Sequence, residues 1–335
     1  MRVVVFIVFL TSMAFAQMSL KIAQYNVQNL FDLQKSGNEY EEYIPFGKSN
    51  WNTKTYRVKL NHIAKVLSEI NADIVALEEI ESLQALKDLQ KTLTSFGVYY
   101  RYKAIANKKN TTVKVAFLSK IPPVYTKELW VTRSYKYRNI LEAKFSVGKE
   151  DFYLFINHFK SKRAPESRRI VSAKVLYKRL VHLGFDKNII VTGDFNSDYE
   201  EYKKFRRKRK LNDTNGKTAL NHLLGTLYNQ EDSLHVKVKP ESLYNLWYDL
   251  ANEQRWNYIH KKKKENLDSI LISASLLDNK GLEYKKGSFG VYKQPYLFYK
   301  KRINSWYIQY RKNSRRHMAK GYSDHLPIFA TFIFK

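Results

Sequence analysis

The stretches Gly193-Asp194-Phe195-Asn196 and Ser323-Asp324-His325-Leu326-Pro327 each join an apolar run to a tight group of oxygen-bearing and imidazole side chains. The apolar residues 189–191 lead into the first group, and the apolar residues 328–330 follow the second. A carboxylate at the edge of a buried sheet is costly unless it is paired or bound to a metal ion. Two such groups, far apart in the chain, therefore predict one site built where strands end.

Apolar runs of strand length recur along the chain, at residues 20–27, 74–77, 113–118, 140–147, 152–156, 189–192, 269–272 and 327–334. Several runs are apolar at successive positions, which is typical of strands covered on both faces. Between the runs, apolar residues recur with helical spacing in residues 58–70 and 83–93. A third such segment begins at Pro165, where proline is tolerated, and continues through Leu180. Strands alternating with helices predict α/β layers packed around sheets.

The first sixteen residues have the pattern of a signal peptide. Arg2 precedes an apolar run, residues 3–10, and Ala14-Phe15-Ala16 has the small-x-small form of a cleavage site. The run is far shorter than the roughly 20 residues that span a bilayer. We therefore expect residues 1–16 to direct export to the periplasm or the medium, with cleavage after Ala16 and no stable membrane anchor.

Residues 17–335 are expected to form one domain. No linker rich in Gly, Pro or Ser divides them, although residues 38–55 and a basic, aromatic stretch near 278–320 have the composition of surface insertions. The chain contains no cysteine, which excludes disulfide bonds and a lipid-modified cysteine at the cleavage site. The fold must therefore depend on its apolar core, and a contribution from bound ions is left open.

The charge of the chain is strongly positive. Lys and Arg number 59 against 31 Asp and Glu, a net charge of +28 to which residues 1–16 contribute only Arg2. The cations cluster in residues 203–210, 261–264 and 311–320, and Trp306, Tyr307 and Tyr310 lie close by. Such a field attracts polyanions, and exposed rings can stack on bases, which favours nucleic acid. A solvated lysine-rich surface or a contact with a membrane surface would also account for the charge.

Polar residues with catalytic chemistry follow the apolar run 152–156. His158, in Asn157-His158-Phe159-Lys160, is a candidate acid or base, although a lone histidine is more often structural. The nearby Arg163, Arg168 and Arg169 can grip phosphate or solvate the next helix. Taken alone, this segment therefore indicates a phosphate site without requiring one.

Further candidates stand at the ends of neighbouring runs. Glu78 and Glu79 can bind a hard cation such as Mg²⁺, which takes one or two carboxylates plus substrate phosphate, or can interact with the dipole of the next helix. Asp268, if it lies near His325, would orient the ring and stabilise its protonated form; otherwise it is a solvated acid at a strand end. Asn26 follows the first run and, taken alone, is a turn residue.

The order of these motifs resembles the endonuclease/exonuclease/phosphatase superfamily, which includes pancreatic-type deoxyribonucleases, abasic-site endonucleases, inositol-phosphate phosphatases and bacterial sphingomyelinases. The Gly-Asp-x-Asn and Ser-Asp-His-x-Pro strings are its most specific signals, and the match runs from about residue 20 to residue 334. The resemblance implies a four-layer α/β sandwich, in which two packed mixed β-sheets are flanked by helices. It also implies hydrolysis of phosphate esters with a divalent metal, usually Mg²⁺, although Mn²⁺ or Ca²⁺ could take its place.

Carried over onto this sequence, the family pattern implies a metal site with Glu79 as ligand and Asn26 beside it. Asp194 and Asn196 would position the nucleophilic water and the scissile phosphate, and Asp324 would complete the metal or phosphate site. The family segment ends in Gln-Glu, whereas this chain has Glu-Glu at residues 78–79. That departure leaves open which of the two glutamates is the ligand.

The same pattern implies that His158 and His325 flank the phosphate, with Asp268 orienting His325. We favour His325 as base, because Asp268 would raise its basicity, and His158 as acid or phosphate ligand, with the reverse assignment open. Arg138 and Lys160 are expected to contact the phosphate.

The fold alone does not choose the substrate. Export and the positive charge favour a secreted nuclease that cuts DNA with little sequence preference. RNA is a second candidate substrate. A secreted phosphodiesterase of the sphingomyelinase type is one rival, and a set of apolar residues could serve it by touching lipid: Phe289, Tyr296, Leu297, Phe298 and Tyr299. A toxin-like nuclease subunit and a binding protein with a spent active site are two further rivals.

Overall fold

The computed structural model describes residues 18–205, 210–311 and 314–335. The expected signal peptide, residues 1–16, lies outside the described residues. So do residues 206–209 of the first basic cluster and Lys312 of the third.

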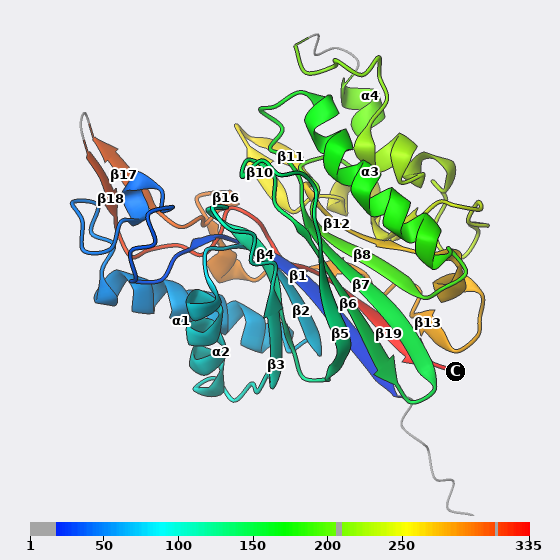
Figure 1. Cartoon of the computed structure of the whole chain (residues 1–335), viewed down its shortest axis with the longest axis horizontal. Coiled ribbons are helices and arrows are strands. Elements are labelled where there is room, and N and C mark those ends of the chain that lie inside the picture. Colours follow the sequence, from blue (N-terminus) through cyan, green and yellow to red (C-terminus); the bar gives the residue numbers. More distant parts are fainter. Residues whose placement is uncertain (1–17, 206–209, 312–313) are drawn as a thin grey trace, which may run out of the picture.

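Two mixed β-sheets form the centre of the molecule (Figure 1). The first sheet has seven strands, which in spatial order are β13 (Leu282–Tyr284), β19 (Ile328–Phe334), β1 (Ser19–Leu30), β2 (Ile74–Ile80), β4 (Lys114–Ser119) and β3 (Tyr102–Ile105), with β14 (Gly290–Val291) pairing β19. The second has six, in the order β5 (Pro123–Leu129), β6 (Ile140–Val147), β7 (Glu150–His158), β8 (Ile189–Asp194), β12 (Asp268–Ile272) and β9 (Tyr244–Asn245).

Each sheet contains one parallel pair among antiparallel neighbours. β1 pairs in parallel with β2, and β7 pairs in parallel with β8. A parallel pair needs a long crossover connection, and in both cases that connection contains a helix. The crossovers are α1 (Thr53–Ile70) between β1 and β2, and α3 (Glu166–Leu183) between β7 and β8.

Helices cover the outer faces of both sheets. α1 and α2 (Leu83–Thr94) pack on the first sheet, while α3 and the π-helical turn η2 (Ala219–Leu223) pack on the second. The expected four-layer sandwich, two packed mixed sheets flanked by helices, is therefore confirmed.

Shorter elements decorate this frame. One is the short helix α4 (Glu201–Phe205). Six are 3-10 turns: η1 (Glu41–Tyr43), η3 (Thr226–Tyr228), η4 (Leu246–Asp249), η5 (Asn252–Gln254), η6 (Ala274–Leu277) and η7 (Pro295–Leu297). The others form three hairpins: β10 (Tyr258–His260) with β11 (Lys263–Glu265), β15 (Phe298–Tyr299) with β16 (Arg302–Ile303), and β17 (Ile308–Arg311) with β18 (Ser314–His317).

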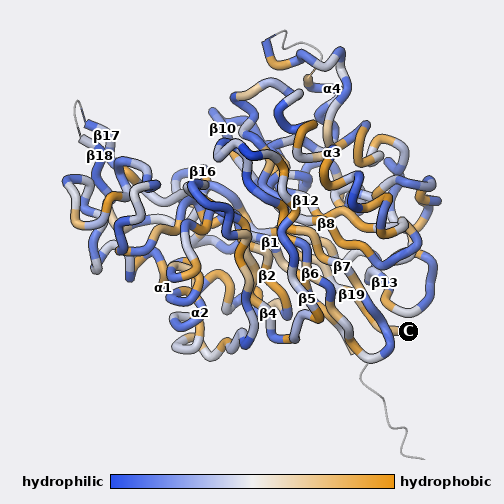
Figure 2. The backbone as a smooth tube through the Cα atoms, viewed as in Figure 1, coloured by the Kyte–Doolittle hydropathy of each residue, from blue (hydrophilic) through white to orange (hydrophobic). Residues whose placement is uncertain are grey.

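Strand periodicity explains why three apolar cores separate the four layers. Side chains alternate between the faces of a strand, so on β2 Ile74 and Ala76 face the second sheet while Val75 and Leu77 face α1 and α2. On β8, Ile190 lies between the sheets and Val191 packs toward α3. Figure 2 shows this as hydrophobic residues concentrated along the strands, with hydrophilic loops around them. The apolar runs in the sequence are therefore strands covered on both faces, as predicted.

The predicted insertion near 278–320 is only partly a surface insertion. β13 and β14 lie within it and pair with β19, so its first part is the edge of the first sheet. Trp306 is only 2% exposed, so its ring is not free for the base stacking expected of it. Tyr307 and Tyr310, at 49% and 68% exposure, remain free to stack.

No helix in residues 18–205, 210–311 and 314–335 is both long enough and apolar enough to cross a membrane.

The close approach of β7 and β8 at Gly193 yields a stability prediction. Gly193 has φ +135°, and a Cβ there would lie 1.9 Å from the backbone oxygen of Asn157. Gly193→Ala should therefore lower the free energy of unfolding by about 3 kcal/mol or more, since both backbone strain and a clash with a buried backbone atom are imposed. Denaturant unfolding measures this change.

Gly287→Ala is the matched control. Gly287 has φ +75° but nothing within 4 Å of its Cβ position, so only the left-handed backbone penalty of about 1 kcal/mol applies. Equal losses in the two variants would contradict the role given to the close approach at Gly193.

Candidate active site

The inward-facing rows of five strands change from apolar to polar at the same end of the sandwich. On β8 the row runs Ile190, Thr192, Asp194, and on β7 it ends in His158. Pairing sets the level of these groups, because Asp194 is the register partner of both His158 and Asp268. The rows on the remaining strands end likewise, so the complete set is Asn26, Glu78, His158, Asp194 and Asp268. A polar layer therefore continues the core between the two sheets.

A bulge in β2 separates the two neighbouring glutamates. The pairing register shifts between Glu78 and Ile80, and Glu79 takes a left-handed conformation with φ 65°. A bulge re-aims a side chain that strict alternation would send to the other face. Glu78 is fully buried and accepts a hydrogen bond from Gln24 Nε2 at 2.6 Å, whereas Glu79 lines the cleft described below. Only Glu79 of the pair is placed to meet a ligand there.

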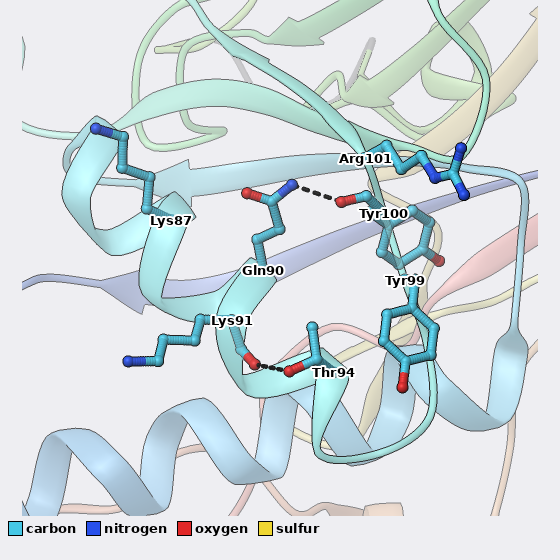
Figure 3. Close-up of a pocket in the computed structure, with 7 residues that line it drawn as sticks. All are labelled: Lys87, Gln90, Lys91, Thr94, Tyr99, Tyr100 and Arg101. Atoms are coloured by element: carbon cyan, nitrogen blue, oxygen red, sulfur yellow. Dashed lines mark hydrogen bonds between the residues drawn. The ribbon is translucent and has the colours of Figure 1, made fainter.

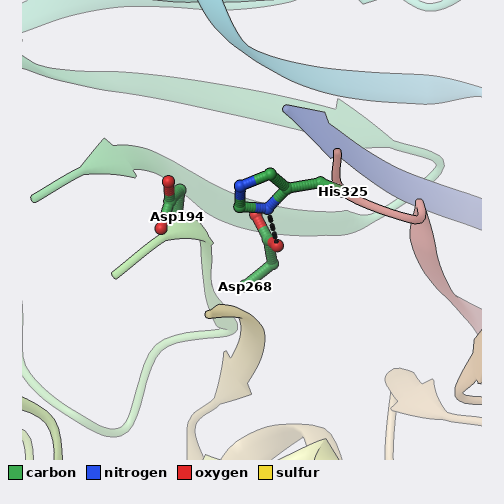
Figure 4. Close-up of side chains that lie close together, drawn as sticks. All are labelled: Asp194, Asp268 and His325. Atoms are coloured by element: carbon green, nitrogen blue, oxygen red, sulfur yellow. Dashed lines mark hydrogen bonds and ion pairs between the residues drawn. The ribbon is translucent and has the colours of Figure 1, made fainter. Parts of the chain in front are cut away.

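His325 and Asp268 form an oriented pair (Figure 4). His325 Nδ1 lies 2.6 Å from Asp268 Oδ2. Asp268 also accepts hydrogen bonds from Gln24 Nε2 at 2.7 Å and from the Asn257 side chain. Burial opposes the charged imidazole, but Asp268 outweighs it, and the pKa of His325 is raised well above its usual value. His325 is therefore held as an imidazolium.

Asp194 stands between the two histidines. Its Oδ1 accepts from the backbone N–H of Asn196 at 2.8 Å and its Oδ2 from Asn26 Nδ2 at 3.1 Å. Burial, followed by the nearby Asp268, raises the pKa of Asp194 to about 7. A carboxylate with a pKa near neutrality can accept and return a proton under physiological conditions.

His158 has the opposite electrostatics to His325. Burial, followed by Arg138 and His325, lowers the pKa of His158 well below its usual value, so its ring is neutral. His158 Nε2 lies 3.4 Å from Asp194 Oδ2, and its buried Nδ1 has no hydrogen-bond partner among the described residues. A neutral ring in this place is a hydrogen-bonding group rather than a source of charge.

These groups open onto a cleft of about 580 Å³. Its floor includes Glu79, His158, Asp194, Asp324 and His325. Its walls include three cationic side chains and two aromatic ones, namely Arg138, Lys162, Arg163, Tyr40 and Tyr258.

Two of the expected phosphate contacts have different surroundings. Arg138 lines the cleft, and its buried Nε has no hydrogen-bond partner among the described residues. Lys160 is not among the cleft residues; its Nζ lies over the Tyr137 ring, 6.0 Å from the centroid. Arg163 reaches the cleft instead. The structure thus places Arg138 in the lining of the cleft and Lys160 outside it.

The donor set at the cleft fits a divalent cation. Glu79 and Asp324 present carboxylate oxygens, and Asn26, which donates to Glu79 Oε1 over 3.4 Å, lies directly behind. Burial, followed by repulsion from Asp324, raises the pKa of Glu79, which is the response of two carboxylates that share a site without a cation. Oxygen ligands of this kind suit Mg²⁺, Mn²⁺ or Ca²⁺.

A second group of candidate ligands, Asp194, Asp268 and His325, has its ligand atoms within 4.8 Å of one another. Asp268 already accepts from three donors there, one of them His325 itself. We therefore interpret this group as an oriented histidine beside a carboxylate rather than as a metal site.

Sequence reasoning did not find three supporting residues. Gln24 bridges Glu78 and Asp268, and Asn257 ties Asp268 to the backbone oxygen of Leu326. Lys59 on α1 is fully buried, and its Nζ donates to the backbone oxygens of Gln28 at 3.0 Å and Tyr322 at 3.1 Å. Lys59 falls on the apolar face of its helix, and that position was a signal present in the sequence.

Comparisons with protein families and with solved structures show what this chain is similar to. A profile of the Endonuclease/Exonuclease/phosphatase family matches residues 21–235. Among curated proteins, the sequence has no significant match.

Solved structures share the fold at low sequence identity. D. rerio TDP2 complexed with single strand DNA product aligns with a TM-score of 0.58 at 14% identity, over 94% of this chain and 98% of that chain. Truncated Caenorhabditis elegans TDP2 gives 0.56 at 15%, over 94% and 97%. A mannosyl-6-phosphatase from Bacteroides thetaiotaomicron gives 0.55 at 16%, over 94% and 100%. At these identities the likeness concerns the fold alone.

The oriented histidine gives a prediction for its titration. In Asp268→Asn the carboxylate that stabilises the imidazolium is removed while its size is kept. The pKa of His325 should therefore fall by at least about one unit. A histidine NMR titration of the metal-free protein measures this. His62, whose ring stacks on Tyr322, serves as an internal control and should titrate unchanged; an identical His325 curve in both proteins would contradict the pairing.

The buried Lys59 gives a prediction for stability against pH. Burial lowers the pKa of Lys59 to about 7, while in the unfolded chain it is about 10.4. Between these values the unfolded state binds the extra proton, so Lys59 makes stability increase with pH, by at most about 1.4 kcal/mol per pH unit. Lys59→Met should remove this increase. Unfolding free energies of both proteins from pH 6 to pH 10 test it, and parallel curves would contradict the assignment.

Proposed function

The chain belongs to the Endonuclease/Exonuclease/phosphatase family, and we propose that it is a secreted, metal-dependent nuclease that hydrolyses phosphodiester bonds of DNA with little sequence preference. One observation carries the proposal. Arg138 and Arg163 line the same cleft as the acidic and imidazole groups, on a chain whose net charge is +28. Cations around a hydrolytic centre suit a polyanionic substrate.

The residues of the chain divide the chemistry of a phosphodiester hydrolysis. Water forms a bond to phosphorus while the bond from phosphorus to the leaving oxygen breaks. Asp194, with its pKa near neutrality, takes the proton of the water, and Asn196 holds Asp194 Oδ1 through its backbone N–H. The imidazolium of His325, kept charged by Asp268, supports the developing negative charge and can protonate the leaving oxygen.

This division differs from the sequence expectation that His325 is the base, because an imidazolium has no free pair to accept a proton. His158 and Arg138 are placed to donate hydrogen bonds to phosphate oxygens. Glu79 and Asp324, with Asn26 beside them, would hold a divalent cation, which would supply Lewis-acid stabilisation of the phosphate charge.

The environment of the aromatic stretch weakens the case for a lipid substrate. Of the five residues expected to touch a bilayer, Phe289 and Leu297 are buried, and Tyr296 and Phe298 are half-buried. Only Tyr299, at 63% exposure, is free to meet lipid. The basic hairpins that surround it favour a polyanion with phosphates in series.

The neighbouring structures point to more than one kind of phosphate ester. One of them is a TDP2 complexed with single strand DNA product. Another is a mannosyl-6-phosphatase, so a sugar phosphate is included as a substrate in the test below.

The experiment incubates the mature protein with plasmid DNA, RNA, sphingomyelin vesicles and a sugar monophosphate, each with Mg²⁺, Mn²⁺, Ca²⁺ or EDTA. We expect metal-dependent loss of plasmid with intact lipid and intact sugar phosphate. Asp194→Asn, His158→Ala and His325→Ala should each lower the DNA cleavage rate by at least about 100-fold while DNA binding survives.

Asp186→Asn is the matched control, because Asp186 is an exposed carboxylate whose ion pair is with the adjacent Lys187. Its rate should equal that of the unmodified protein. Lipid or sugar-phosphate hydrolysis without DNA cleavage would overturn the choice of substrate. Near-normal turnover in Asp194→Asn would overturn the role of that carboxylate.

A further inference from the structure

Two short basic hairpins, β10–β11 and β15–β16, lie near the catalytic groups. Tyr258 and His260 of the first line the cleft, and β16 of the second contacts β10; Figure 1 labels β10, β11 and β16. Each hairpin is closed by a two-residue turn, and both turns have the sequence Lys-Lys, at residues 261–262 and 300–301. All four lysines have left-handed backbones, with φ 45° and 68° in the first turn and 45° and 61° in the second.

Lysine is a poor choice for these positions on structural grounds. Two-residue hairpin turns with positive φ at both central residues strongly prefer Asn-Gly or Asp-Gly, because a Cβ is strained in the left-handed region. The same unfavourable dipeptide in two neighbouring hairpins is therefore not explained by turn formation. Strain held in this way indicates that the side chains themselves have a function.

A groove of about 480 Å³ lies between the hairpins. β10 and β16 contact each other, and the groove is lined by Ile259, Lys261, Lys262, Arg302, Ile303, Ser305 and Asp324. The groove has three cationic side chains and one acidic side chain, Asp324. Asp324 also lines the catalytic cleft, so the groove and the cleft share this residue. The groove is therefore a continuation of the cleft past the metal-binding carboxylates.

The backbone fastens both hairpins to the catalytic groups. Tyr258 of β10 forms a β-bridge with His325, and the N–H of Leu326 donates to the backbone oxygen of Asn257 at 2.8 Å. After β16, the N–H of Tyr322 donates to the backbone oxygen of Asn304 at 2.7 Å. The groove thus has a fixed position relative to the scissile phosphate.

We propose that this groove binds the phosphodiester backbone of a nucleic acid strand on one side of the scissile bond. The proposal rests on the proposed function and adds to it a place where the strand continues beyond the reacting phosphate. Lys261, Lys262 and Arg302 would contact phosphates, which position a strand without reading its sequence. The exposed ring of Tyr299, next to the second turn, is free to stack on a base.

A second hollow on the molecule provides a control. It has about 400 Å³ and lies at the end of α2, where Lys87, Lys91 and Arg101 supply three cations of the same kinds (Figure 3). None of its lining residues lines the cleft or the groove. General electrostatic attraction acts equally through both hollows, whereas a strand path acts only through the groove.

The experiment compares two triple variants. The groove variant carries Lys261→Asn, Lys262→Gly and Arg302→Gln, and the control variant carries Lys87→Gln, Lys91→Gln and Arg101→Gln. Binding of a 30-nucleotide single-stranded DNA is measured in EDTA over a salt series, and cleavage is measured on that DNA and on bis(p-nitrophenyl) phosphate with metal.

For the groove variant we expect Kd for the oligonucleotide to rise about tenfold or more and the salt slope to become shallower by about 0.7 for each phosphate that the variant no longer neutralises. Cleavage of bis(p-nitrophenyl) phosphate, which is too small to reach the groove, should be unchanged. The melting temperature should stay level or rise, because Asn-Gly suits the turn better than Lys-Lys. Lys300→Asn with Lys301→Gly should weaken oligonucleotide binding further.

Equal reductions of affinity in the groove and control variants would overturn the groove, as would unchanged affinity in the groove variant. The proposal would also be overturned if the groove variant lost its binding to anionic phosphatidylserine vesicles but kept its affinity for the oligonucleotide, since the hairpins would then bind a membrane. Failure of the proposed function has a different signature, in which the unmodified protein cleaves neither the oligonucleotide nor the small diester. The binding measurement in EDTA still reports on the groove in that case.

Discussion

Buried acidic groups that lie close together are the constraint on which this molecule depends. Glu78, Glu79, Asp194, Asp268 and Asp324 interact with one another at the end of the inter-sheet core, and burial raises the pKa of Glu78, Glu79 and Asp194. Such a set is stable only if protons, cations or hydrogen bonds neutralise it. The carboxyl groups are neutralised in different ways, and these differences give them different chemical roles.

The way in which each carboxyl group is neutralised follows from its position on its strand. Glu78, deepest between the sheets, has its pKa raised well above the usual value and bonds to Gln24, so it is a neutral structural group. Asp268 is compensated by the charged ring of His325. Glu79 and Asp324 lie at the cleft, where Glu79 accepts from Asn26 and a bound cation would neutralise both carboxylates. Asp194 belongs to none of these three cases and is therefore the carboxyl group that is free to exchange a proton.

Much of this arrangement could be predicted because it follows strand periodicity. The eight apolar runs all coincide with strands, and the motifs at their ends meet because paired strands bring those ends to one level. β5 was not predicted, since it alternates half-buried and exposed residues at the edge of its sheet. The choice between Glu78 and Glu79 was also hidden, because a bulge depends on the pairing partner rather than on local sequence. Gln24 acts through contacts distant in sequence, which no local pattern records, whereas the place of Lys59 on the apolar face of α1 was a signal in the sequence although its partners were not.

Left-handed non-glycine residues occur in the cleft and in both hairpin turns, as well as at positions outside them, such as Asn71 at the end of α1. Glu79 and Asn196 adopt this conformation inside the cleft, and Lys261, Lys262, Lys300 and Lys301 adopt it in the turns of the two hairpins. Glu79 is held by the pairing of β2 with β1 and β4, and Asn196 lies two residues past the end of β8. The lysine turns belong to hairpins whose neighbouring backbones are fastened to His325, Leu326 and Tyr322. Strained positions of this kind persist only where the surroundings over-determine them, so the rigid sandwich is what permits reactive carboxylates at its centre and cationic side chains at its edge. In the proposed function, the acids would hold a cation and a proton and the lysines an anionic strand, and the cleft and the groove meet at Asp324.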